Sequence, residues 1–232
     1  MVGVFFIFNT MHPFIQDIQF EFSRHANPAR AKQMADYMKN HFVFLGIRSP
    51  ERMAISKSWL QELQSVSIEE KFLLIHQLWE MNEREYQMAA LEIINRIKVK
   101  DWKKESIDEL EMLITTKSWW DSVDLIASSA VGRYFQAFPE KRDEIIQKWS
   151  ESNNMWLQRS TLIFQLKYKA EIDFDLLIAL IKKYQHNNEF FIQKAIGWSL
   201  RQYSKFNPEA VISVLPTLSI SNLAIREASK YL

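Results

Sequence analysis

The chain has 232 residues, of which 47% are hydrophobic and 25% are charged, proportions typical of a globular protein with a sizeable core. It contains only 4 glycines and 6 prolines, too few for a hairpin-rich sheet protein, and has no glycine-rich phosphate loop. The absence of cysteine excludes disulfides, thiolate zinc sites and cysteine nucleophiles, and a net charge of +1 excludes a uniformly basic surface. We therefore expect a mostly helical protein.

Metal sites and membrane segments are not predicted. No two histidines lie four residues apart, so we expect neither a metal nor a cofactor. The apolar run Val4–Phe8 is far shorter than the roughly 20 residues that span a bilayer, and no signal-peptide pattern surrounds it. We expect a cytoplasmic protein. The five histidines are His12, His25, His41, His76 and His186.

Along the chain, an apolar extension at residues 1–10 precedes helical patterning over residues 11–232. Pro28 and Pro50 each follow a residue with a capping side chain, which indicates helix starts. No Ser/Gly-rich linker or block of charge divides the chain, so we expect a single domain. Later helix boundaries are indicated by Pro139, Pro208 and Pro216.

Internal repetition predicts the architecture. Five similar ten-residue segments recur, and their third positions are separated by 34, 37, 35 and 32 residues. A period of this length with two helices per unit is typical of an α-solenoid of HEAT-like repeats, whose second helices line a concave face suited to a long ligand. The third positions are Gln87, Asp121, Gln158, Gln193 and Ile225.

The stretch from Lys117 to Asp124 is chemically unusual. Ser118 and Asp121 have the spacing of a capping box, which predicts a helix start at Ser118. Asp124 lies four residues after Trp120, so an aromatic ring and a carboxylate share one helix face and are suited to a sugar or a cation. The alternative is that Asp124 forms a salt bridge with an arginine of the next repeat.

Basic residues recur at the predicted helix starts of the last three repeats. Arg159, Lys194 and Arg226 are placed in a first helical turn, where a cation opposes the helix dipole. This placement indicates an anion held jointly by side chain and helix N-terminus, with phosphate the obvious ligand. Arg201 and Lys205 extend the same strip. The alternative is surface charge or ion pairing between repeats.

Further aromatic residues have two interpretations. Trp198 directly follows Gly197, a helix-interior glycine of the kind found where something must approach the backbone closely. Trp198 is therefore either a second aromatic plate or a core residue, and Tyr37 has the same two interpretations. We interpret five further tryptophans as packing residues: Trp59, Trp79, Trp102, Trp119 and Trp149.

Taken together, these segments resemble the AlkD-type HEAT-like-repeat DNA glycosylases, which remove alkylated bases. The resemblance extends from about Met11 to the C-terminus. It implies a catalytic role for Asp124 and sugar contacts from Trp120 and Trp198. The matching segments are MADYMKNHFVFLGI (34–47), LWEMNEREYQMAALEI (78–93), TTKSWWDSVD (115–124), NMWLQRSTLIFQLKYK (154–169) and EFFIQKAIGWSLRQYSKFNP (189–208).

The resemblance also implies a key arginine at Arg159 and a cleft-lining tyrosine at Tyr37. The implied activity is monofunctional hydrolysis of the N-glycosidic bond of N3- and N7-alkylated purines in duplex DNA, which leaves an abasic site. The implied enzyme is a monomer that needs no metal or cofactor. We assign further DNA contacts to Lys117, Lys194, Arg201 and Arg226.

A function of a different class stays open beside this one. A non-catalytic HEAT-like solenoid that binds DNA structures or a protein partner would use Trp120 and Trp198 for packing and Asp124–Arg159 as a structural ion pair. Two departures from the family pattern are noted. Residues 1–10 have no counterpart in it, and the chain stops at Leu232, where we expect the DNA-binding strip to be trimmed.

Overall fold

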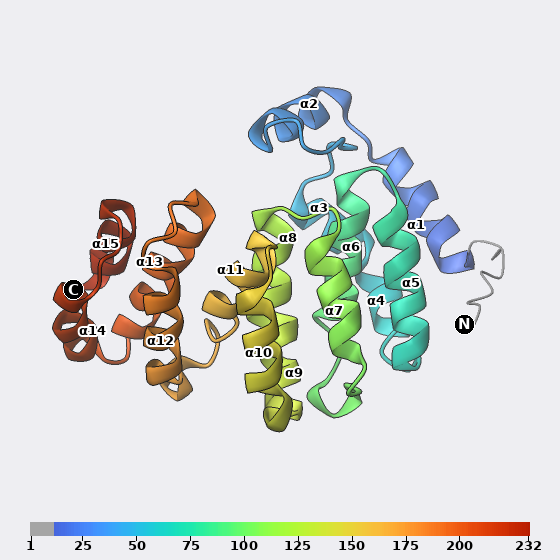
Figure 1. The fold of residues 1–232 in the computed structure, drawn as a ribbon. Helices are drawn as coiled ribbons and strands as arrows, with labels where there is room; N and C mark the ends of the chain where they lie inside the picture. The colour runs from blue at the N-terminus through green and yellow to red at the C-terminus, as the bar shows by residue number, and fades with distance from the viewer. Residues whose placement is uncertain (1–11) are drawn as a thin grey trace. The chain divides into compact units, whose positions relative to one another are not determined.

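The computed structural model describes residues 12–232. All the regular secondary-structure elements in this part of the chain are helices or helical turns (Figure 1). The predicted all-α fold of two-helix repeats is confirmed. Packing divides the chain into two compact units, Met1–Lys98 and Val99–Leu232, so the single domain over residues 11–232 stays a prediction. The proposed extension at residues 1–10 lies outside the described residues.

In the first unit, proline and capping side chains set the helix starts. Asn27 accepts a hydrogen bond from the Arg30 backbone N–H, and Pro28 is the first residue of its helix. Pro50 is the second residue of the next one. Both predicted starts are confirmed. The helices are α1 (Pro13–Arg24), α2 (Pro28–Tyr37), α3 (Ser49–Ile55), α4 (Lys57–Glu62), α5 (Ile68–Glu80) and α6 (Arg84–Ile94).

A buried carboxylate anchors the loop that follows α2. The Glu85 side chain, at the start of α6, accepts hydrogen bonds of 2.8–3.1 Å from the backbone N–H groups of Leu45, Gly46 and Ile47. Gly46 has a φ of +87°, and a Cβ there would lie 2.2 Å from the Asn27 carbonyl oxygen. Only glycine permits this turn, so α6 and α2 are joined through a backbone loop of defined shape.

The second unit consists of paired helices connected by short turns. The predicted boundaries are confirmed, since Pro139 and Pro208 begin helical segments and Pro216 lies in one. The helices are α7 (Ser106–Thr115), α8 (Trp120–Leu125), α9 (Gly132–Ala137), α10 (Arg142–Glu151), α11 (Met155–Ile163), α12 (Phe174–Tyr184), α13 (Phe190–Ser204), α14 (Pro208–Val214) and α15 (Asn222–Ala228). Single 3₁₀ turns lie at Val99–Asp101, Pro139–Lys141, Lys169–Glu171, Leu215–Thr217 and Ser229–Tyr231.

A recurring glutamine explains part of the sequence period. Gln87 donates from Nε2 to carbonyl oxygens at the end of α5, the closest at 2.7 Å. Gln158 donates to the Ser152 carbonyl after α10, and Gln193 donates to the Asn187 carbonyl after α12, each at 2.7 Å. In each pair, the fourth residue of the second helix thus satisfies carbonyls that the end of the first helix leaves without partners.

The predicted register of the repeats is wrong by two residues in one unit. The fourth residue of α8 is Val123, not Asp121, so the spacings along the chain become 36, 35, 35 and 32 residues. The error came from aligning Trp119 with Trp156. Trp156 is the second residue of α11, whereas Trp119 precedes α8, which begins at Trp120.

The predicted capping box is also wrong. The Ser118 hydroxyl donates to the Ile114 carbonyl at 2.6 Å, so it completes the end of α7 rather than starting the next helix. Asp121 accepts from the adjacent Ser122 N–H, and α8 begins two residues later than predicted. A short turn lets one hydroxyl serve either helix, and here the carbonyls at the end of α7 take it.

Candidate functional site

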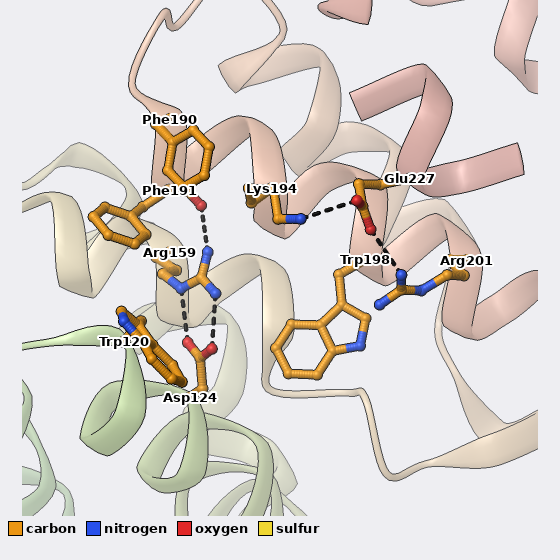
Figure 2. A pocket seen from close by; sticks show the side chains of 9 residues that line it. All are labelled: Trp120, Asp124, Arg159, Phe190, Phe191, Lys194, Trp198, Arg201 and Glu227. Atoms are coloured by element: carbon orange, nitrogen blue, oxygen red, sulfur yellow. Dashed lines mark hydrogen bonds and ion pairs between the residues drawn. The ribbon is translucent and has the colours of Figure 1, made fainter. Parts of the chain in front are cut away.

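A pocket of about 350 Å³ lies in the second unit (Figure 2). Its walls come from four second helices, α8, α11, α13 and α15, and its lining combines aromatic rings with charged side chains. Six residues predicted from the sequence line it together. The lining residues are Trp120, Asp124, Arg159, Phe190, Phe191, Lys194, Trp198, Arg201 and Glu227.

Three of the charged residues that line the pocket occupy a repeated helix position. Asp124, Arg159, Lys194 and Arg226 are each the fifth residue of their helices, α8, α11, α13 and α15. The first three line the pocket, and Arg226 is exposed outside it. The prediction that the three cations lie in a first helical turn is wrong, because each helix begins one residue before the predicted segment and the cation is its fifth residue, just past the first turn. The argument from the helix dipole therefore does not apply to them.

Asp124 and Arg159 form a two-pronged ion pair across 35 residues of sequence. The Arg159 Nε donates to Asp124 Oδ1 at 2.7 Å, and Nη2 donates to Oδ2 at 2.8 Å. Arg159 Nη1 also donates to the Phe191 carbonyl oxygen, which links α11 to α13. The Arg159 side chain is 4% exposed and that of Asp124 is 17% exposed. The carboxylate is held by a neighbour and still reaches the pocket.

Burial and ion pairing oppose each other at Asp124. Burial raises the pKa of the Asp124 carboxyl above its ordinary value, because a charged group is disfavoured away from water. The hydrogen bonds and positive charge of Arg159 oppose that rise. The bidentate geometry requires an ionised carboxylate, since a protonated one presents a single acceptor oxygen to the arginine fork. Arg159 is thus the group that keeps Asp124 charged.

The helix that carries Asp124 is irregular immediately after it. A π-helical segment, Ile126–Val131, joins α8 to α9, and the Ser128 hydroxyl donates to the Asp124 carbonyl at 2.7 Å. π-helical turns are rare in proteins and are frequent at functional sites. Ser128 therefore satisfies the backbone carbonyl of Asp124 where the helical geometry changes.

Aromatic rings form the apolar part of the pocket. Trp120 and Trp198 are half-buried, and Phe190 is 55% exposed at the start of α13. Figure 2 shows the Trp198 ring between the Asp124–Arg159 pair and the charges near Glu227. Phe191, which also lines the pocket, packs with Trp119 and Trp156, and the ring centroids lie 5.0–5.8 Å apart. Trp120 and Trp198 are therefore accessible to a ligand.

The predicted basic strip carries its own counter-ion. Glu227 of α15 accepts from Lys194 Nζ at 2.9 Å and from Arg201 Nη1 at 2.7 Å, and it pairs with Lys230 at 2.9 Å. Its side chain is only 7% exposed. The hydrogen bonds from Lys230 and Lys194 lower the pKa of Glu227 to about 2. Glu227 was not predicted from the sequence, although it directly follows Arg226.

Gly197 allows this counter-ion to approach. A Cβ at Gly197 would lie 2.6 Å from the Glu227 Cβ and 2.7 Å from the Ala224 carbonyl oxygen. The close approach predicted at this glycine is therefore made by α15, which packs on α13. Phe190 and Phe191 were also missed, although Phe190 is the first residue of α13, as Trp120 is of α8.

Three predicted DNA-contacting residues do not line the pocket. Tyr37 is 72% exposed at the end of α2 in the first unit. Lys117 lies in the turn before α8 with a φ of +46°, and Arg226 lies exposed on α15. The described residues contain no cluster of acidic or histidine side chains able to hold a metal ion. In the same residues, no helix is long and apolar enough to cross a membrane.

Comparison with known proteins identifies the family. Residues 18–232 match the family model described as DNA alkylation repair enzyme. The chain belongs to this family. Membership supports a role in DNA repair and is consistent with an enzyme, and the resemblance noted in the sequence is confirmed at the level of the family. No curated protein is significantly similar to the chain.

Solved structures agree with this assignment. A predicted DNA alkylation repair enzyme from Enterococcus faecalis is 39% identical, with a TM-score of 0.83 over 89% of this chain and 96% of that one. AlkD2 from Streptococcus mutans is 20% identical, with a TM-score of 0.60 over 76% of this chain and 89% of that one. The smu.31 protein of Streptococcus mutans UA159 is 19% identical, with a TM-score of 0.58 over 78% and 97%. The last two likenesses concern the fold alone.

Proposed function

We propose that this family member is a monofunctional DNA glycosylase, which hydrolyses the N-glycosidic bond of N3- and N7-alkylated purines in duplex DNA. The observation that carries the proposal is a carboxylate, Asp124, that is held charged by Arg159 and reaches a pocket lined by Trp120 and Trp198. The enzyme acts as a cytoplasmic monomer on alkylated duplex DNA, without metal or cofactor.

The chemistry follows from the charge of the lesion. Alkylation at N3 or N7 makes the purine cationic, so the base departs as a neutral molecule and needs no general acid. The remaining task is to stabilise the positive charge that develops on deoxyribose, and one preoriented carboxylate does this. Asp124 also orients the attacking water, whose oxygen bonds to the sugar carbon as the bond to the base breaks and whose extra proton is released to solvent. The product is an abasic site.

Aromatic and basic side chains complete the proposed site. The π faces of Trp120 and Trp198 favour a cationic sugar over a neutral one. Arg159 fixes Asp124 and has N–H groups left to contact an adjacent phosphate. Lys194 and Arg201 bind the DNA backbone from α13. Further backbone contacts are proposed for Tyr37, Lys117 and Arg226, which lie outside the pocket.

The first experiment removes one charge. Asp124→Asn keeps the side-chain shape, and we expect single-turnover excision of N7-methylguanine from a duplex to fall about 100- to 1,000-fold, as for loss of other preoriented electrostatic groups. Excision is measured as strand breaks after alkali treatment. Asp121→Asn, one turn earlier and outside the pocket, is the matched control and should excise normally. Near-normal excision by Asp124→Asn would refute the assignment.

A binding experiment tests the same carboxylate without any reaction. Two duplexes carry either a cationic pyrrolidine or a neutral tetrahydrofuran in place of one nucleoside. The wild-type protein should bind the cationic analogue more tightly, because the carboxylate and the two rings favour positive charge on the sugar. Asp124→Asn should lose this preference and still bind the neutral duplex. Equal preference in both proteins contradicts the proposal.

The second candidate function is a non-catalytic solenoid that binds DNA structures or a protein partner. The observation that favours it is the Asp124–Arg159 ion pair itself, which this function uses only for packing. The alkali assay separates the two functions. A wild-type protein that binds duplex DNA and leaves no breaks at N7-methylguanine or N3-methyladenine is a scaffold.

A further inference from the structure

One face of α13 presents both the DNA-binding cations and the contact with α15. Lys194, Gly197, Trp198 and Arg201 have the spacing i, i+3, i+4 and i+7, so they lie along a single stripe. Because Gly197 has no side chain, α15 approaches this stripe closely and brings the Glu227 Cβ next to it. Figure 2 shows the Glu227 carboxylate between Lys194 and Arg201.

Each oxygen of this carboxylate holds one of the two cations. Oε1 accepts from Lys194 and Oε2 accepts from Arg201, so the spacing of the two oxygens sets the spacing of the two donors. Lys194 is 36% exposed on its side chain, which leaves N–H donors for a ligand in the pocket. Held in this way, the two side chains have already given up much of the conformational freedom that binding would otherwise remove.

We propose that Glu227 is a positioning residue, which holds Lys194 and Arg201 as a fixed two-point grip for the DNA backbone beside Asp124. The proposal rests on the glycosylase function proposed above. The carboxylate reduces the positive charge of the grip. Because it also fixes Lys194 and Arg201, it keeps the bound strand in one position. Glu227 therefore lowers the affinity for undamaged DNA, and it places the sugar of the damaged nucleotide correctly at Asp124.

If both effects hold, Glu227→Gln should bind DNA more tightly and yet excise the base more slowly. Glutamine keeps the shape and removes the charge, so Lys194 and Arg201 become free to bind phosphates separately. We expect several-fold tighter binding to an undamaged duplex, and a steeper dependence of log affinity on log salt by about one to two, which corresponds to one or two more neutralised phosphates. We expect excision of N7-methylguanine at saturating enzyme to slow about tenfold. A merely structural residue would not raise affinity while lowering the rate.

Lys230→Ala is the matched control. It removes the third cation from the same carboxylate, and Lys230 does not line the pocket. We expect its salt slope to be no steeper and its excision rate to equal that of the wild type. Thermal unfolding of all three proteins verifies that each variant folds.

The outcomes separate clearly. A steeper slope together with slower excision supports the positioning role. An unchanged slope in Glu227→Gln overturns it, as does a steeper slope with an unchanged rate, which would make Glu227 a simple charge neutraliser. If the wild-type protein excises nothing, the glycosylase proposal fails by itself, and the salt slope still decides whether Glu227 holds the two cations.

Discussion

Asp124 and Glu227 line the same pocket and both pair with basic side chains, but burial and charge are balanced differently around them. Asp124 has one cationic partner, and burial raises its pKa despite that partner. Glu227 has three cationic partners, and hydrogen bonds from two of them, Lys230 and Lys194, lower its pKa to about 2. Burial therefore dominates the pKa of Asp124, whereas hydrogen bonds from lysines dominate that of Glu227.

The difference matches the two proposed tasks. A carboxylate that stabilises a developing cation must keep negative charge that its partners do not neutralise. Asp124 keeps such charge because it has a single arginine partner. A carboxylate that positions other residues needs no such charge, and Glu227 is fully engaged. Three predictions test this contrast.

The largest expected effect concerns the partner of Asp124. Arg159→Gln leaves a mostly buried carboxylate without its cation, and we expect the free energy of unfolding at pH 7 to fall by about 3–5 kcal/mol. Urea denaturation measures this. The double variant Arg159→Gln/Asp124→Asn should recover most of the loss, because no buried charge remains. Equal losses in the single and double variants would show that the destabilisation comes from packing rather than charge.

The second prediction compares the two carboxylates as the pH falls. The pKa of Glu227 is lowered, so its stabilising contribution is present above its ordinary value of 4.5 and is lost as the pH falls toward about 2. Solvent near the cluster weakens this contribution. We therefore expect the free energy of unfolding at pH 7 to be about 1–3 kcal/mol higher for the wild type than for Glu227→Gln. That difference should shrink on acidification.

Asp124 should behave in the opposite way. Its pKa is raised, so protonation favours the folded state as the pH falls through the folded pKa toward the ordinary value of 3.8. Relative to Asp124→Asn, the wild type should gain stability over that range. Denaturation of both variants against pH measures the two trends, and trends of the same sign would contradict the contrast between the sites.

The smallest expected effect is a shift in the pH profile of excision. The reaction needs ionised Asp124, so the rate should fall as the pH drops through its raised pKa. This fall should occur at a higher pH than for an exposed aspartate. Arg159→Gln removes the group that opposes the rise, and the acid limb should move to higher pH. Single-turnover rates from pH 4 to 8 measure it. An acid limb at the same pH in both proteins would contradict the role given to Arg159.

How much of the site was predictable depended on the kind of information each residue carries. Trp120, Asp124, Arg159 and Trp198 were found because their types and spacing match a family pattern and helical periodicity. Glu227 was missed because an acidic residue on a helix is ordinary in a sequence. Its importance comes from ion pairs with three basic side chains, which only the folded structure shows. The alternative prediction, a salt bridge between Asp124 and an arginine of the next repeat, is confirmed as an ion pair with Arg159.

The sequence by itself determined the helical class, the two-helix repeat and most helix starts, because composition, capping residues and prolines act over a few neighbouring positions. The tertiary structure decided the register at Trp119 and the helix that Ser118 completes, since either assignment satisfies local hydrogen bonding equally well. It also decided which charges meet. Asp124 and Arg159 lie 35 residues apart, and only the packing of α8, α11, α13 and α15 brings them and the Glu227 cluster to one pocket.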